Sequence, residues 1–400
     1  MERSGLGMVS RASLRKAILL SVLIVSISAG ALMTSFFPSD QNQSEEAKKE
    51  DCYLGVAFCG NTTAEAKLLI DRVKNYTNLL VLQSGPVSNS ETATNEICDY
   101  AAEAGLKLIV YFGDLDPRVL GDEKSWRIDW VRSARQRFNN SLLGIYYYDE
   151  PGGLYLDTDW SLYPRAFPSN STYDSAAERY IRLVKRDPGL VLLRNYSVPA
   201  FVSDYTLYWF DYLGGYDVVF AQVGWNHSLY QDVALLRGAS RLQNKSWGVI
   251  ITWKYDEQPY LATAEEIYQQ MVESYTAGAD YITIFNYPQL EGYSYGVMTE
   301  EHFEALERFW NGIVKNPKFA HGSTKAEAAL VLPKNYAWGM RNPEDRIWGY
   351  WGPDEKSLAI WSLSRSLLTQ YGLRLDILYD DPNFPVNNNY TKVYYWNQTT

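Results

Sequence analysis

Eight short apolar runs alternate with longer amphipathic segments between residue 53 and residue 314. Continuous apolar runs separated by helical periodicity are typical of a parallel sheet covered on both faces. The apolar runs predict buried strands at 53–59, 79–83, 106–112, 142–148, 199–203, 216–223, 247–253 and 280–285. The segments between them predict helices at 63–75, 91–104, 125–138, 173–186, 228–242, 263–277 and 300–314.

The number of these units favours a closed barrel. Eight strand–helix units over about 260 residues match the count and size of a (β/α)8 TIM barrel, which we predict for residues 52–316. A doubly wound open sheet is the alternative. A long loop, 151–172, follows the fourth strand at the end where barrels build the walls of their substrate sites.

The pattern restarts after residue 316. It predicts a strand at 326–332, a helix at 357–371, and strands at 374–379 and 392–396. We therefore expect a small C-terminal α/β domain over 317–400, flavodoxin-like in type. Three strands and one helix make a thin domain, so it either packs on the barrel or is an incomplete version of that fold.

The N-terminus predicts export. Four basic residues between positions 3 and 16 precede an uncharged run, 17–37, that is long enough to span a bilayer. We expect a signal anchor or transmembrane helix in 1–37 and a polar linker over 38–51. Ala29-Gly30-Ala31 also fits a signal-peptidase site, so the protein is either membrane-anchored with an extracytoplasmic domain or secreted.

A second signal agrees with this location. The sequence contains ten N-x-S/T sequons, which are acceptors for N-glycosylation and predict an extracellular glycoprotein. We also expect these asparagines to lie mostly in surface loops. They are Asn42, Asn61, Asn75, Asn139, Asn170, Asn195, Asn226, Asn244, Asn389 and Asn397.

Composition narrows the classes of ligand. The net charge of −10 and the pI near 5.0 argue against nucleic acid. The 32 Tyr, 13 Trp and 14 Phe suit either a carbohydrate groove or the packing of a large barrel. Three histidines, no C-x-x-C pair and no glycine-rich phosphate loop give no reason to expect a metal or cofactor.

The three cysteines allow either a bridge from Cys98 to Cys52 or Cys59, or three separate thiols.

The strand ends carry the candidate chemistry, because barrel enzymes place their sites at the C-terminal ends of the strands. Glycoside hydrolysis uses two carboxyl groups that flank the scissile bond. Glu150 follows the fourth strand, and Glu257, with Asp256 as its rival, follows the seventh. The competing interpretations are a structural cap or ion pair for Glu150 and a solvated loop for the other two.

Other polar and aromatic residues complete the predicted ring. Asp204 has the alternative role of capping the short aromatic helix that follows it, and any of the aromatic residues has the alternative role of packing in the core. The candidate substrate-binding residues are Asp149, Tyr111, Asp204, Gln222, Trp225, Trp253, Lys254, Asn286 and Tyr287.

This arrangement resembles the large clan of (β/α)8 glycoside hydrolases with an acid/base Glu after strand four and a nucleophilic Glu after strand seven. The usual strand-four motif of that clan is Asn-Glu-Pro, and here it is Asp149-Glu150-Pro151. The resemblance implies that Glu150 is the acid/base and Glu257 the nucleophile of a retaining enzyme. Residues 52–400 are also similar to membrane-anchored archaeal proteins of glycosidase-like appearance.

The sequence therefore predicts an extracytoplasmic glycoside hydrolase that acts on a polysaccharide or glycan without a cofactor. Its expected partners are a carbohydrate and, through the N-terminal helix, a membrane. The alternative is a non-catalytic glycan-binding or cell-envelope barrel. A metal-dependent hydrolase or deacetylase is disfavoured because the strand ends offer no His and Asp ligand set.

Overall fold

The computed structural model describes residues 52–225, 227–287, 294–316, 318, 320–386 and 390–398. The predicted anchor over 1–37 and the linker over 38–51 lie outside these residues, as does the sequon residue Asn226. Every helix within the described ranges is too short or too polar to span a bilayer. All described residues belong to one unit, 50–400, which is the part of the chain considered below.

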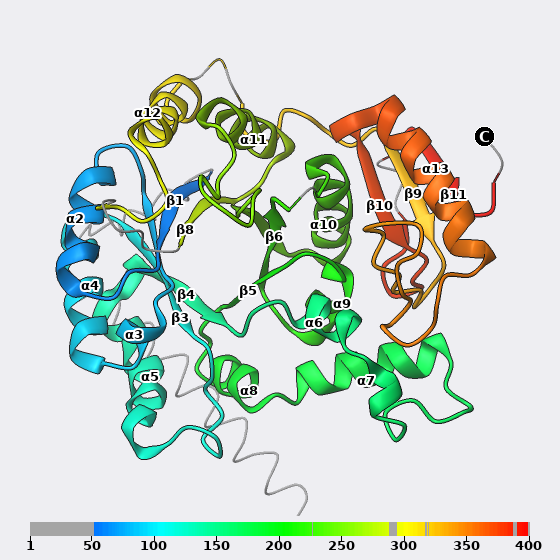
Figure 1. The fold of residues 1–400 in the computed structure, drawn as a ribbon, viewed down its shortest axis with the longest axis horizontal. Helices are drawn as coiled ribbons and strands as arrows, with labels where there is room; N and C mark the ends of the chain where they lie inside the picture. Colours follow the sequence, from blue (N-terminus) through cyan, green and yellow to red (C-terminus); the bar gives the residue numbers. More distant parts are fainter. Residues whose placement is uncertain are drawn as a thin grey trace, which may run out of the picture. The chain divides into compact units, whose positions relative to one another are not determined.

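Eight parallel strands close into a barrel in sequence order, and β8 pairs with β1 (Figure 1). The closed barrel confirms the predicted TIM architecture and excludes the open sheet. Each observed strand overlaps its predicted apolar run. The strands are β1 (Tyr53–Phe58), β2 (Leu79–Leu82), β3 (Lys107–Phe112), β4 (Leu142–Tyr147), β5 (Ala200–Asp204), β6 (Val218–Val223), β7 (Ser246–Ile251) and β8 (Tyr281–Asn286).

Helices surround the strands (Figure 1). The seven predicted helices and the short aromatic helix expected after Asp204 are present, and the described residues add α3, α6 and α8. One of these, α6, corrects the prediction of a continuous loop over 151–172. The helices of the barrel are α2 (Thr63–Val73), α3 (Gly85–Ser88), α4 (Glu91–Glu103), α5 (Trp126–Phe138), α6 (Pro151–Asp157), α7 (Tyr173–Lys185), α8 (Pro188–Asn195), α9 (Tyr208–Gly214), α10 (Leu229–Gln243), α11 (Ala264–Ala277) and α12 (Glu300–Phe309).

Large and small residues complement each other inside the barrel. The rings of Phe201 and Phe220 fill its centre. A Cβ atom added at Gly144 would lie 2.6 Å from the Phe201 ring, and one at Gly248 would lie 2.6 Å from the Phe220 ring. Glycine at these two strand positions therefore makes room for the aromatic residues of the neighbouring strands.

The thiols of Cys59 and Cys98 are free and buried, so of the two alternatives the bridge from Cys98 does not form. Cys59 follows β1 and Cys98 lies in α4. Burial raises the pKa of both thiols well above the usual value for cysteine. The charge of Asp149 adds to this effect at Cys59, which places this thiol near the C-terminal ends of the strands.

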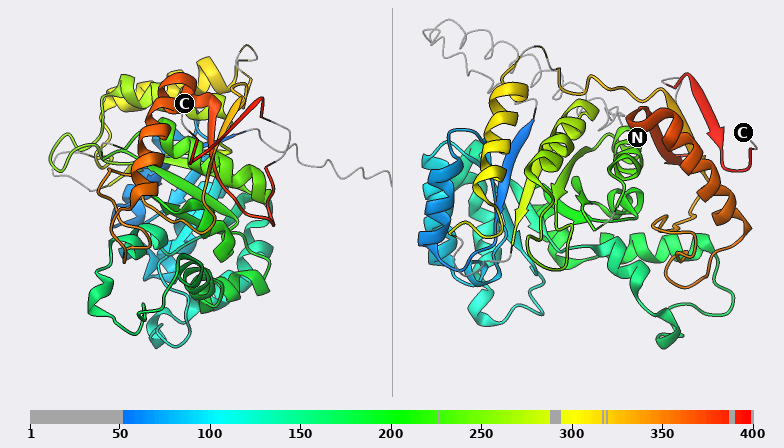
Figure 2. Two further views of the ribbon diagram at one scale, coloured as in Figure 1. Left: turned by 90° about the vertical axis from the view of Figure 1, so that its right-hand side faces the viewer. Right: turned by 45° about the horizontal axis from the view of Figure 1, so that its top comes forward.

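The C-terminal segment forms a small parallel sheet of order β10-β9-β11 and one long helix. These elements confirm the predicted small sheet. Figure 2 shows the sheet and α13 beside α10 of the barrel. The elements are β9 (Ala328–Leu332), α13 (Glu355–Tyr371), β10 (Leu375–Tyr379) and β11 (Lys392–Tyr395).

A buried ion pair joins α10 to β10. Arg237 Nε lies 2.8 Å from Asp376 Oδ1, and both side chains are almost fully buried. The guanidinium also donates to the carbonyl oxygens of Leu373 and Leu375, so its N–H groups are well satisfied. Gly238 lets the two elements approach, because a Cβ there would lie 2.8 Å from the carbonyl oxygen of Ile377.

We expect Arg237→Ala to lower the free energy of unfolding by about 2–3 kcal/mol, because Asp376 loses its buried partner and keeps Arg241 and the hydroxyl of Tyr390. The matched control is Arg374→Ala, whose ion pair with Glu327 is solvent-exposed and contributes about 0–1 kcal/mol. Urea denaturation of both variants measures the difference. Equal effects of the two substitutions would contradict the structural role given to the buried pair.

The sequon asparagines that the structure describes are all exposed. This confirms the expectation of surface positions for these seven residues. Asn75, Asn139, Asn195 and Asn244 lie at or just after the C-terminal ends of helices, at the pole of the barrel opposite the C-terminal strand ends. The other described sequon asparagines are Asn61, Asn170 and Asn397.

Candidate functional site

A cavity of about 190 Å³ opens at the C-terminal ends of the strands. Six of the predicted site residues line it: Asp149, Glu150, Gln222, Trp225, Trp253 and Tyr287. The other lining residues are Gln83, Tyr146, Ser203, Ile250, Thr252 and Phe285. Half of the twelve predicted site residues therefore lie in the lining of one cavity.

Asp149 is held by two hydroxyl groups from neighbouring strands. Tyr146 Oη donates to Asp149 Oδ1 at 2.6 Å, and Ser203 Oγ donates to the same oxygen at 2.9 Å. Burial raises the pKa of Asp149 to about 6, and the charge of Glu150 adds to this, although the two hydroxyl donors oppose it. Asp149 is therefore a carboxyl group that exchanges its proton near neutral pH.

Glu150 reaches across the mouth of the barrel to β6. Its Oε1 accepts a hydrogen bond from Gln222 Nε2 at 2.7 Å, and Gln222 also donates to Ser203 Oγ at 3.0 Å. The backbone of Glu150 is left-handed, with φ 51°. A non-glycine residue in this conformation carries strain, and such residues concentrate at functional sites.

The segment after Glu150 is shaped for close packing. Pro151 starts α6, where its missing N–H costs no hydrogen bond. A Cβ at Gly153 would lie 2.1 Å from the ring of Tyr205, and one at Gly152 would lie 2.8 Å from Leu207 Cβ. The two glycines that follow the acidic pair therefore allow the strand-four and strand-five loops to touch.

Asp204 anchors this segment and does not line the cavity. It is fully buried and accepts hydrogen bonds from the backbone N–H groups of Gly152 at 2.6 Å and Gly153 at 2.9 Å. It thus satisfies the N-terminus of α6, whereas the sequence suggested substrate binding or a cap on the following helix, α9.

Asp204 is one half of a buried acid pair. Burial raises the pKa of Asp204 to about 7, although four backbone N–H donors oppose it. Burial and the neighbouring Asp204 raise the pKa of Asp211 further, while the hydroxyl of Tyr180 donates to Asp211. Asp204 accepts four backbone N–H groups, two of them at the start of α6, whereas Asp211 accepts the hydroxyl of Tyr180, so a negative charge is better stabilised on Asp204.

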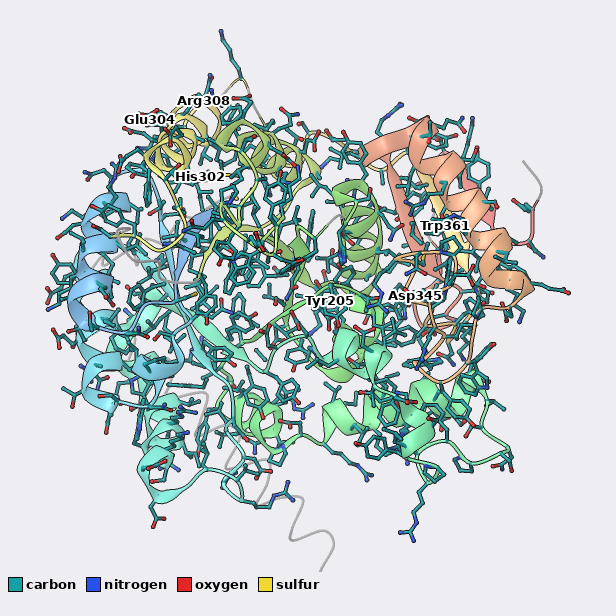
Figure 3. The ribbon with its side chains drawn as sticks, in the orientation of Figure 1. Tyr205, His302, Glu304, Arg308, Asp345 and Trp361 are labelled. Atoms are coloured by element: carbon teal, nitrogen blue, oxygen red, sulfur yellow. The ribbon has the colours of Figure 1, made fainter. Side chains whose placement is uncertain are left out.

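The C-terminal segment braces the same region from outside. Arg341 forms ion pairs with Asp157, the last residue of α6, and with Asp345. Tyr205 Oη donates to Asp157 at 2.7 Å. Figure 3 labels Tyr205 on the barrel side and Asp345 on the C-terminal side of this junction. The C-terminal unit thus supports the segment that begins with Glu150.

Aromatic residues from later strand ends form another part of the lining. Trp253 and Tyr287 stack with an interplanar angle of 11°, and the indole N–H of Trp253 donates to the carbonyl oxygen of Tyr287. Trp225 packs against Trp253. Trp225 is 40% and Tyr287 44% exposed, so both rings present surface to a ligand.

The predicted strand-seven carboxyls lie elsewhere. Asp256 and Glu257 are exposed in the loop after β7 and are not part of the cavity lining. Lys254 pairs with Glu266 at 2.7 Å. The structure therefore does not bring these three residues to the cavity with Glu150.

Two further candidates have structural contacts instead of a place in the lining. Asn286 is buried and accepts hydrogen bonds from the backbone N–H groups of Val297 and Met298. Tyr111 packs edge-on against Tyr146, with ring centroids 5.3 Å apart. It supports the residue that holds Asp149.

Sequence reasoning did not select Tyr146 and Ser203 as site residues, although both contact Asp149. The alternation of side chains between the two faces of a β-strand could have identified both residues. Tyr146 lies in the inner core of the barrel and Tyr147 in the outer layer. By the same alternation, Ser203 points toward the cavity and Asp204 toward the helices.

No group of three or more His, Cys, Asp or Glu side chains that could hold a metal occurs among the described residues. The polar groups of the cavity are instead carboxyl, hydroxyl and amide groups. Such groups can bind hydroxylated ligands and exchange protons with them.

Comparison with solved structures supports the barrel fold. A GH5_18 protein from Streptomyces cattleya, solved in complex with GlcNAc, shares 14% identity with a TM-score of 0.51, over 87% of this chain and 99% of that chain. A beta-mannanase from the blue mussel Mytilus edulis shares 9% identity with a TM-score of 0.40, over 68% and 94%. A 3-hexulose-6-phosphate synthase shares 11% identity with a TM-score of 0.36, over 65% and 99%.

These likenesses concern the fold alone, because the sequence identities are 14% or lower. No family model and no curated protein matches this sequence.

The raised pKa of Asp149 predicts a pH dependence of stability. Asp149 binds its proton below about pH 6 in the folded protein but only below about pH 3.9 in the unfolded chain. The folded state holds more protons between these values, so the free energy of unfolding decreases as the pH rises through this window.

We expect Asp149→Asn to flatten the stability profile between about pH 4 and pH 6, because the amide does not titrate. Urea denaturation of both proteins at several pH values checks this. The exposed substitution Asp174→Asn is the control and should leave the slope unchanged. Parallel profiles for wild type and Asp149→Asn would show that Asp149 ionises at its ordinary pKa.

Proposed function

We propose that the protein is a glycoside hydrolase that acts on a glycan at the cavity, with Glu150 as the general acid/base. The observation that carries this proposal is the pairing of two carboxyl groups, Asp149 and Glu150, with an exposed aromatic surface in one cavity. Aromatic faces stack on sugar rings, and a carboxyl group can protonate the glycosidic oxygen.

A non-catalytic glycan-binding barrel would need the aromatic residues but not a partly buried acid. Burying a carboxyl group costs free energy, and Asp149 is nonetheless held in place by two donors. The free-energy cost of placing Asp149 there is explained if this carboxyl group takes part in the reaction. The roles of Glu257 and Asp256 as nucleophile stay predictions from the sequence.

The location of the protein is part of the proposal. The apolar run 17–37 would anchor the protein in a membrane or be removed on secretion, and the barrel would be extracytoplasmic. The exposed sequon asparagines support glycosylation in such a compartment. We regard the C-terminal sheet as a reduced flavodoxin-like unit that braces the barrel. The likeness to archaeal proteins also stays a prediction.

Glu150→Gln should lower kcat at least 100-fold on glycosides with poor leaving groups, because the amide cannot donate the proton that the leaving oxygen needs. The loss should be much smaller for a 2,4-dinitrophenyl glycoside, whose leaving group departs without a proton. The measurement is kcat on both kinds of substrate.

Glu178→Gln is the matched control, because Glu178 is exposed on α7 away from the cavity. Its kcat should equal that of the wild type. Near-normal turnover by Glu150→Gln on both substrates would remove Glu150 from the chemistry and favour the glycan-binding alternative.

A further inference from the structure

The acids of the cavity lie on one side of it. Among the described lining residues, Asp149 and Glu150 are the only carboxylic acids, and both follow β4. The barrel order places β8 four strands away, on the opposite side, and the lining there is Phe285 and Tyr287. Hydrolysis by two enzyme carboxyls needs them on either side of the scissile bond, and these two neighbours do not provide that arrangement.

The two oxygens of the Asp149 carboxyl group, which lines the cavity, differ in their hydrogen bonds. Both of its hydroxyl donors bond to Oδ1, and no hydrogen bond from the part of the chain that the structure describes reaches Oδ2. An ionised carboxylate only accepts hydrogen bonds. A ligand group that bonds to the ionised Asp149 must therefore be a hydrogen-bond donor. An amide N–H is such a donor, and it cannot itself accept a hydrogen bond.

We propose that the substrates are 2-acetamido-2-deoxyhexosides and that the acetamido group of the substrate is itself the nucleophile. This inference rests on the proposed function and specifies its substrate class. Asp149 accepts the acetamido N–H and turns the carbonyl oxygen toward C1. Glu150, the neighbouring residue, protonates the glycosidic oxygen. The nucleophile thus comes from the substrate, as in the substrate-assisted class of glycoside hydrolases.

The steps balance without a further reactant except water. The acetamido oxygen forms a bond to C1 while the bond from C1 to the leaving oxygen breaks, and the proton of Glu150 passes to that oxygen. The cyclic oxazolinium ion is positively charged, and ionised Asp149 beside its N–H stabilises it. Water then adds to C1, gives a proton to Glu150 and restores the amide, so the anomeric configuration is retained.

The size of the cavity limits what it holds. Its volume of about 190 Å³ is below the range of about 300–1,000 Å³ found for sites of drug-sized ligands. One sugar residue with its acetamido group suits this volume, and the remainder of a glycan would lie outside. The site therefore fits the terminal residue of a chain.

The test compares 4-nitrophenyl 2-acetamido-2-deoxyglycosides of gluco and galacto configuration with the corresponding 2-hydroxy glycosides. We expect the full-length protein to hydrolyse an acetamido substrate with retention, seen by NMR of the released sugar. A trifluoroacetamido substituent should lower kcat at least tenfold, because its carbonyl oxygen is a weaker nucleophile. Asp149→Asn should lower kcat at least tenfold on the acetamido substrate.

Hydrolysis of the 2-hydroxy glycosides with comparable kcat/KM, or inversion of configuration, would overturn this inference and keep the proposed function. Loss of activity in Glu257→Gln, Asp256→Asn or Glu291→Gln that azide restores would reveal an enzyme nucleophile and have the same effect. Glu291 is included because it lies outside the described residues. Hydrolysis of neither substrate class would overturn the proposed function as well.

Discussion

The path of the chain at the mouth of the barrel depends on the position of the Asp204 carboxylate. Its oxygens accept the N–H groups of Gly152 and Gly153, which would otherwise be unpaired donors at a buried helix start. The helix start fixes the direction in which the chain leaves Glu150. The backbone N–H donors and the positive end of the helix dipole favour a negative charge on Asp204. An acid that never meets the ligand thus determines how the acids of the cavity are presented.

The same geometry explains how the C-terminal unit supports the site. It contacts α10 through Arg237 and Asp376 and holds the end of α6 through Arg341. The long connection after β4 is therefore fixed at its start by β5 and at the end of α6 by a segment almost two hundred residues later. Side chains that must act in a defined geometry benefit from such support, because small displacements are costly in binding and catalysis.

The sequence predicted the parts of the fold that have a long or regular signal. Continuous apolar runs located all eight barrel strands, whereas α6 and α8 span too few residues to show helical periodicity. Glu150 could be placed because it lies only three residues beyond the end of β4. Glu257 lies six residues beyond β7, and adjacency along the chain does not fix the direction of a side chain in an exposed loop. The role of Asp204 depends on residues fifty positions away, which no local pattern contains.

The buried thiols of Cys59 and Cys98 allow local opening of this protein to be measured by chemical labelling. A thiol reacts with alkylating reagents as the thiolate, which burial disfavours at Cys59 and Cys98. Their reaction must therefore wait until the surrounding structure opens. Cys59 lies beside Asp149 under the mouth of the barrel, while Cys98 lies in the helical layer. The rate at which Cys59 reacts therefore reports how often the structure opens around the end of β1, and the rate at which Cys98 reacts reports how often it opens around α4.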